Sequence, residues 1–337
     1  MDLAEAFLAL LLGSVLVVSL LSNLLVLLCF LSSSELRQQV PGLFLVNLSL
    51  CNLLLTLLNM PFTLLGLLWR QQPVGDCACQ AAGFLETLLA SNAMLSMAAL
   101  SLDKWVAVVF PLSYARGAWP AALLLAYAWL HSLAFPLAAL VCSWLGYSGT
   151  YASCTLHLRI EADRRRFASF TVAFHAASFA LSLVVLCFTY LKVLRVARFH
   201  CRRIDVITMQ TLVLLVDIHP SVRQRCLNEQ KRRRQRATKK ISIFIGSFIL
   251  CFAPYVITRL VELLPFITIN NYWGVISKCL TYSKAALDPF VYSLLRQQYK
   301  KVVINIVNRL LRRDIYPSSG YNSSLDTEND YCLHRPN

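Results

Sequence analysis

Seven apolar segments, each long enough to cross a lipid bilayer, constrain this chain more than any other feature. A transmembrane helix needs about 20 mostly apolar residues to span a hydrocarbon core about 30 Å thick. Only helices and closed barrels satisfy the backbone in lipid, and these segments are far longer than barrel strands. The sequence therefore predicts an all-α membrane protein, a seven-transmembrane helix bundle. The segments lie at about 5–31, 40–68, 79–110, 118–144, 167–199, 235–264 and 272–295.

The composition agrees with this interpretation. Of the 337 residues, 57% are hydrophobic and only 15% are charged, whereas a soluble domain has about 25% charged residues. The first apolar run is too long for a signal-peptide core and has no basic leader. We therefore expect residues 1–4 to form a short extracellular N-terminus and 5–295 to form the bundle.

Basic residues set the expected orientation, because Lys and Arg favour the cytoplasmic side. With the N-terminus outside, the inner loops contain Arg37, Lys104, Arg116 and the basic run at 231–240. Arg164, by contrast, falls on the outer side with its basic neighbours. The sequence predicts a multi-pass plasma-membrane protein. Binding to nucleic acid is not expected from the formal charge of +15, because the basic runs flank membrane spans.

The inner loop at 200–234 and the C-terminal region carry three further expectations. The apolar segment 204–218 is too short to span the bilayer. It either forms a short helix at the membrane face or prolongs span five, and the sequence favours neither. Residues 296–314 repeat apolar positions at helical spacing between basic residues, which predicts a short amphipathic eighth helix on the bilayer surface. Residues 315–337 are expected to be a disordered cytoplasmic tail.

Twelve cysteines do not indicate a disulfide scaffold, because most lie inside the spans. Cys79 begins span three on the outer side, and Cys154 lies in the outer loop after span four. An oxidising exterior permits a bridge between them, and Cys77 is a competing partner. No metal-ligand spacing is present, and no cofactor is expected.

Polar residues inside membrane spans are costly and usually functional. Here they resemble the ordered markers of rhodopsin-type (class A) G-protein-coupled receptors, over about 5–313. Within that family, the run at 197–241 resembles a small orphan group, which supplies no ligand. The markers are Asn23, "NLSLCNLL" at 47–54, Cys79, "DKWVAVVFPLSY" at 103–114, Trp129, Tyr190, "CFAP" at 251–254 and "DPFVY" at 288–292.

The resemblance implies a coupling surface for heterotrimeric G proteins, and for arrestin, at the inner end of span three. In the family an acid–arginine pair stands there, caged in the off state. Here Lys104 replaces the arginine, and a Lys ammonium has fewer donors in a less rigid arrangement than a guanidinium. The run 231–240 also lacks an acid that could latch it. We therefore expect high ligand-free activity and, by resemblance, the stimulatory, cyclic-AMP-raising class of G protein. The residues assigned to coupling are Asp103, Lys104, Trp105, Pro111, Leu112, Tyr190 and Tyr292.

An internal polar site also departs from the family. Relatives usually have Asp in span two and Asn in span seven, which help to bind sodium, whereas this chain has Asn52 and Asp288. Lys284 lies one helical turn before Asp288. We expect the Lys284 ammonium to take the place of the cation, near Asn52 and Asn23.

The outer half of the bundle is the expected ligand pocket. An acid in span three binds an amine in some relatives, so Glu86 either holds a ligand or pairs internally with Lys278. Phe252 replaces the family's usual Trp, and Ser182 replaces a Pro, which puts the customary bulge in span five in doubt. The candidate pocket residues are Glu86, Phe174, Ser178, Phe252, Arg259, Lys278 and Tyr282.

Three other classes of protein are weaker. An opsin needs a retinal-binding Lys, but Tyr282 stands at that position. A transporter would need several intramembrane charges along a path. No nucleophile elbow, phosphate loop or His cluster suggests an enzyme.

Overall fold

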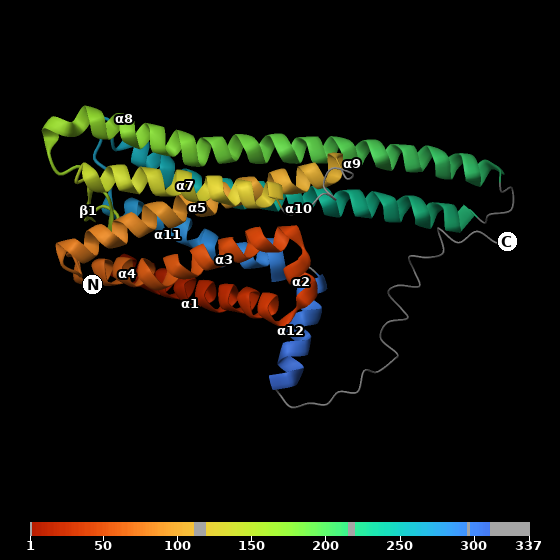
Figure 1. Ribbon diagram of the computed structural model, residues 1–337, viewed down its shortest axis with the longest axis horizontal. Helices are drawn as coiled ribbons and strands as arrows, with labels where there is room; N and C mark the ends of the chain where they lie inside the picture. The colour runs from red at the N-terminus through yellow and green to blue at the C-terminus, as the bar shows by residue number, and fades with distance from the viewer. Residues whose placement is uncertain (1, 111–118, 215–219, 295–296, 311–337) are drawn as a thin grey trace.

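The computed structural model describes residues 2–110, 119–214, 220–294 and 297–310, and these residues are almost entirely helical (Figure 1). Six of the described helical stretches are long and apolar enough to cross a membrane. They lie in α1 (Leu3–Ser32), α3 (Val40–Leu58) with α4 (Met60–Trp69), α5 (Asp76–Val109), α7 (Trp119–Val141), α8 (Arg164–His175) with α9 (Leu181–Leu214), and α10 (Pro220–Val261). In α9 the apolar span ends at Val196, and in α10 it begins at Ser242.

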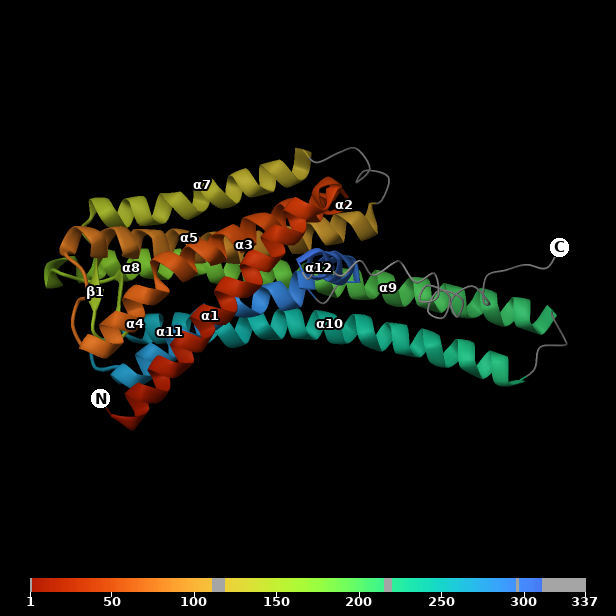
Figure 2. The same cartoon turned by 90° about the horizontal axis from the view of Figure 1, so that it is seen from below.

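The seventh helix of the bundle is α11 (Asn271–Pro289), which falls outside that apolar set. It carries Lys278, Lys284 and Asp288, and each is at most 2% exposed. These charges lower its apolarity, yet they lie inside the protein and not against lipid. The helix packs along α1 and α10 (Figure 2). The predicted all-helical membrane fold is confirmed.

The elements between and after the spans are short. A two-stranded antiparallel hairpin lies at one end of the bundle, and α12 lies across the other end, against α1 (Figures 1 and 2). We call these the hairpin end and the α12 end. The short elements are α2 (Ser34–Gln38), β1 (Leu145–Ser148), β2 (Ser153–Leu156), the 3₁₀ turn η1 (Glu161–Asp163), the π-helical turns η2 (Ala176–Ala180) and η3 (Phe290–Leu294), and α12 (Gln297–Leu310).

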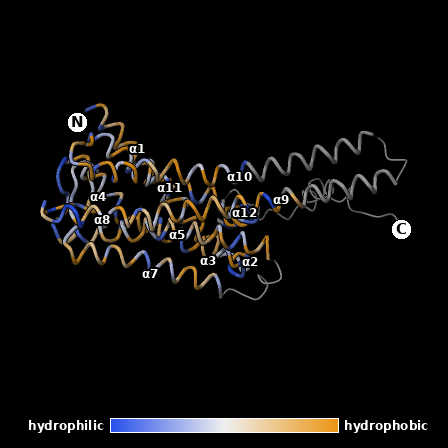
Figure 3. Tube along the Cα trace, turned by 90° about the horizontal axis from the view of Figure 1, so that it is seen from above, coloured by the Kyte–Doolittle hydropathy of each residue, from blue (hydrophilic) through white to orange (hydrophobic). Residues whose placement is uncertain are grey.

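The burial of the spans shows which helix is central. In α5, 83% of the most apolar stretch is buried, against 22% in α7. Large apolar side chains such as Leu10 of α1 and Leu130 of α7 are more than two-thirds exposed. In a membrane this exposure faces lipid, in keeping with the apolar stretches along the spans in Figure 3.

The structure answers two open questions about span five. The π-helical turn η2 ends two residues before Ser182, so a local bulge forms without the family's proline. The apolar segment beginning at 204 continues α9 without a break to Leu214, which is the second of the two expected arrangements. Residues 215–218 of that segment, and the proposed tail at 315–337, lie outside the described residues.

Candidate functional site

A buried ion pair lies at the centre of the predicted internal polar site. Lys284 and Asp288 are one turn apart on α11, and the Lys284 ammonium pairs with Oδ1 of Asp288. The Nδ2 amide of Asn52, on α3, donates to the other carboxylate oxygen at 3.1 Å. All three side chains are at most 2% exposed. The ammonium therefore lies beside the carboxylate, where a bound cation would otherwise balance its charge.

Asn23 of α1 joins this site indirectly. Its Nδ2 donates to the Ala285 carbonyl of α11 at 3.0 Å and to the Ser19 carbonyl at 2.8 Å. The hydroxyls of Ser19 and Thr56 are 2.7 Å apart, and Thr56 donates to the Asn52 carbonyl at 2.7 Å. The sequence analysis missed Ser19 and Thr56. Their spacing of four residues from Asn23 and Asn52 was the available signal.

At the α12 end, Lys104 of α5 meets aromatic rings. Its Nζ lies 5.3 Å from the ring centre of Phe244 on α10 and 5.8 Å from that of Tyr292. The ring of Phe244 lies 4.8 Å from Tyr190 and 4.5 Å from Tyr292. Tyr292 thus contacts Lys104 directly, and Phe244, which the sequence analysis did not select, packs against Lys104, Tyr190 and Tyr292.

Of the other predicted coupling residues, two lie in the described part of α5. Asp103 is buried at the end of α5. The ring of Trp105 packs edge-on against Phe188 of α9 at 6.0 Å. Pro111 and Leu112 lie outside the described residues.

Nearer the hairpin end, a second buried pair joins α5 to α11. The Lys278 ammonium pairs with Oε1 of Glu86. The Tyr282 hydroxyl lies 3.5 Å from the same oxygen and 3.0 Å from the Thr63 hydroxyl. Lys278 also donates to the Tyr255 hydroxyl at 3.4 Å. Of the two roles open to Glu86, the structure therefore has the internal pair.

The remaining candidate pocket residues do not join that pair. Arg259 of α10 reaches the hairpin instead, where it donates to the Leu156 carbonyl at 2.7 Å. Phe174 packs against Phe135 of α7 at 5.3 Å. The other two are also buried: Phe252 packs against Phe248 at 5.1 Å, and Ser178 lies in η2.

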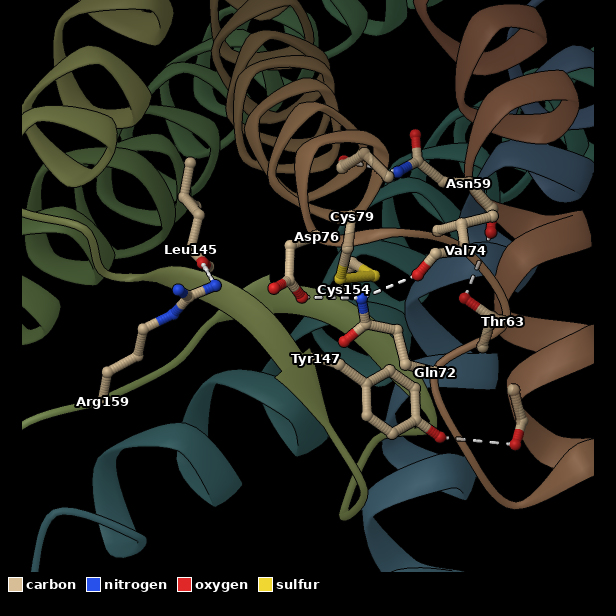
Figure 4. The surroundings of a disulfide bond; sticks show 12 residues. Asn59, Thr63, Gln72, Val74, Asp76, Cys79, Leu145, Tyr147, Cys154 and Arg159 are labelled. Carbon is tan, nitrogen blue, oxygen red and sulfur yellow. Dashed lines mark hydrogen bonds between the residues drawn. A yellow bond between two sulfur atoms is a disulfide. The ribbon is translucent and has the colours of Figure 1, made fainter.

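The disulfide ties the hairpin to the central helix. Cys79, near the start of α5, is bonded to Cys154 of β2, with Cα atoms 5.3 Å apart (Figure 4). Cys77 is a free, exposed thiol. The hydroxyl of Tyr147, a residue of β1, donates to the Gly66 carbonyl of α4 at 3.4 Å. The predicted bridge is confirmed, and the competing partner is not used.

Seven membrane helices, a bridge from the third span to the following loop and a buried polar site on the last span define a class of protein. A model of the family "7 transmembrane receptor (rhodopsin family)" matches residues 22–292. The chain belongs to this family of G-protein-coupled receptors, which act through heterotrimeric G proteins and are not enzymes.

The chain is also similar to individual receptors. It is 64% identical to human G-protein coupled receptor 26 over 327 residues, which cover 96% of this chain and 97% of the relative. It is 60% identical to human G-protein coupled receptor 78 over 324 residues, with 96% and 89% covered. A more distant relative, 5-hydroxytryptamine receptor 4 of Cavia porcellus, is 24% identical over 306 residues, with 88% and 78% covered.

Proposed function

We propose that this receptor activates heterotrimeric G proteins of the stimulatory, cyclic-AMP-raising class and does so strongly without a ligand. We place it in the plasma membrane with the hairpin end outside and the α12 end in the cytoplasm. The basic run at 231–240, which belongs to the α12 side of α10, supports this orientation. The G-protein class rests on resemblance to family members alone.

The contact of Lys104 with the rings of Phe244 and Tyr292 carries the proposal of ligand-free activity. A cation–π contact contributes about 0.5–2 kcal/mol. A hydrogen bond to a charged group contributes about 1.5–3 kcal/mol, and arginine forms two in parallel to a carboxylate. Because each 1.4 kcal/mol is a tenfold change in an equilibrium, an ammonium, which cannot form the parallel pair of bonds that arginine forms, restrains the inner ends of the helices less and favours a more populated open state.

Second-messenger levels in ligand-free cells test the proposal. At equal surface expression, we expect wild type to raise cyclic AMP above mock-transfected cells. Lys104→Arg should lower that signal, because a guanidinium holds the closed state more firmly, and Lys104→Ala should also lower it by removing the group offered to the G protein. Cyclic AMP no higher than in mock cells, together with flat signals for the other messengers, would refute the proposal. A rise confined to another messenger would correct the G-protein class only.

We also propose that the Lys284–Asp288 pair makes the receptor insensitive to sodium. Exchange of sodium for choline at constant ionic strength should leave both the ligand-free signal and the melting temperature of wild type unchanged. A sodium-dependent signal that disappears in Asp288→Asn would contradict this.

The alternatives of a retinal or amine ligand find less support. Both lysines of α11 are paired with carboxylates, and Tyr282 donates to Glu86 within the protein. A retinal Schiff base or a ligand ammonium would have to break a buried ion pair first. Absorbance with added retinal would identify an opsin, and flux in proteoliposomes would identify a transporter.

A further inference from the structure

The hairpin, residues 145–156, is buried within the end of the bundle. In its strands every side chain except that of Tyr147 is buried. Tyr151 and Ala152, in the turn between the strands, are at most 4% exposed. A surface loop normally exposes most of its residues, so this segment occupies space between the helices.

Three glycines from three helices form a close seat for the hairpin. A Cβ on Gly66 of α4 would lie 2.5 Å from the Ala152 carbonyl oxygen. A Cβ on Gly274 of α11 would overlap the Thr150 carbonyl and lie 2.8 Å from its Cγ2. A Cβ on Gly83 of α5 would lie 3.3 Å from the Thr155 backbone nitrogen. Glycine costs a helix about 1 kcal/mol relative to alanine, and these positions gain close backbone approach in return.

Polar contacts connect the seated hairpin to α10. Arg259 donates to the Leu156 carbonyl, and Tyr151 donates at 2.9 Å to Oε2 of Glu262, the residue directly after α10. The hydroxyls of Thr155 and Tyr255 are 3.2 Å apart.

Tyr255 also leads from the hairpin to the buried charges. It accepts from Lys278, which pairs with Glu86. A continuous series of contacts therefore runs from the hairpin backbone to the ion pair that joins α5 and α11.

We propose that the hairpin is the receptor's own activating occupant, a peptide ligand within the chain that holds the signalling state. This rests on the ligand-free activity proposed above. The hairpin's bonds to Tyr255 and Arg259 lie on the outer side of Pro254, the proline inside α10. When the part of α10 after Pro254 is drawn onto the hairpin, the longer part before Pro254 tilts in the opposite sense, away from α5.

The covalent tether explains why no added ligand is needed. The Cys79–Cys154 bond keeps the hairpin at its seat, so it acts at a high effective concentration. A ligand shifts a receptor towards the state that it binds better. In this proposal the hairpin favours the signalling state, because its contacts form fully when the part of α10 beyond Pro254 is drawn in. A diffusible ligand would have to displace the hairpin before binding there.

Gly274→Ala tests the seat, because the added methyl group overlaps the Thr150 carbonyl while the substitution favours the helix. Gly13→Ala is the matched control, since a Cβ there meets nothing within 4 Å. At matched surface levels, Gly274→Ala should accelerate amide hydrogen exchange across 145–156 and reduce ligand-free cyclic AMP several-fold. Gly13→Ala should change neither. Faster exchange with an unchanged or higher signal would overturn the proposal.

Tyr255→Phe supplies a second variant that leaves the seat intact. It removes only the hydroxyl that bonds Thr155 and Lys278, and it should lower the ligand-free signal without faster exchange of the hairpin. An unchanged signal in this variant would also overturn the proposal. Wild type no more active than mock cells would refute the proposed ligand-free activity as well, whereas an active wild type with unaffected variants would refute the hairpin's role alone.

Discussion

At the residue scale, the Lys284–Asp288 pair is the most demanding feature of the bundle. Loss of one partner from a buried ion pair leaves an uncompensated charge and costs about 3–5 kcal/mol. Asp288→Asn should therefore lower the melting temperature of the detergent-solubilised receptor markedly. The double variant Lys284→Met/Asp288→Asn removes both charges and keeps an amide next to Asn52, so it should be more stable than the single variant. A single variant as stable as wild type would show that the pair is not held in the protein interior.

His157 gives the hairpin end a dependence on pH. Burial lowers the pKa of His157 below its usual value, and the positive charges of Arg259 and Arg159 lower it further, against an opposing effect of Glu262. The folded protein thus binds a proton less readily than the unfolded chain. The contribution of His157 to the free energy of unfolding is therefore complete above the unfolded pKa of about 6.5. It decreases as the pH drops below that value.

The pH dependence of the melting temperature measures this effect. Between about pH 7.5 and about pH 5.5, wild type should lose stability by at most about 1.4 kcal/mol per pH unit from this group. His157→Gln should show a shallower fall over the same interval. An identical slope in the two proteins would assign the acid sensitivity to other groups.

At the scale of elements, α12 is attached to the bundle by its apolar face. Val302, Val303 and Ile306 pack against the core cluster, and Tyr299 is only 2% exposed. Val303→Asp would place a carboxylate in that contact, where burying a charge costs several kcal/mol. We expect a lower melting temperature and less receptor at the cell surface.

Asn305→Asp is the matched control for this change. Residue 305 is exposed on the same helix, so the substitution adds the same negative charge without entering the core. If both variants lose stability equally, repulsion from anionic lipid and not packing explains the effect.

Sequence periodicity predicted the elements better than their interruptions. The apolar runs indicated the spans because lipid permits few alternatives. The π-helical turn η2 was not foreseen, because its expected signal was a proline and Ser182 stands there instead. The two outcomes for 204–218 differed only in tertiary surroundings, which a local pattern does not contain.

At the scale of the whole molecule, contacts between distant segments separate what was predictable from what was not. The partners of Asp288 followed from a one-turn spacing and a family likeness. The links from Tyr255 to Thr155 and from Arg259 to Leu156 join α10 to a hairpin about 100 residues away, and nothing local marks those partners. Even so, Tyr255, Arg259 and Glu262 share one helical face through their three- and four-residue spacing. The sequence analysis selected only Arg259 from this face, and the spacing alone does not identify the hairpin as its partner.

The bridge between Cys79 and Cys154 holds these distant parts together, and its partner choice is testable. Removing a native disulfide typically costs about 2–5 kcal/mol, so Cys79→Ser should lower the melting temperature and the surface level of the receptor. Cys77 should not replace it, because residues two apart on a helix point in different directions and Cys77 is exposed, whereas Cys79 is 1% exposed. Cys77→Ser is the control and should behave as wild type. Near-normal stability of Cys79→Ser that is lost in the Cys77→Ser/Cys79→Ser double variant would show that Cys77 can form the bridge after all.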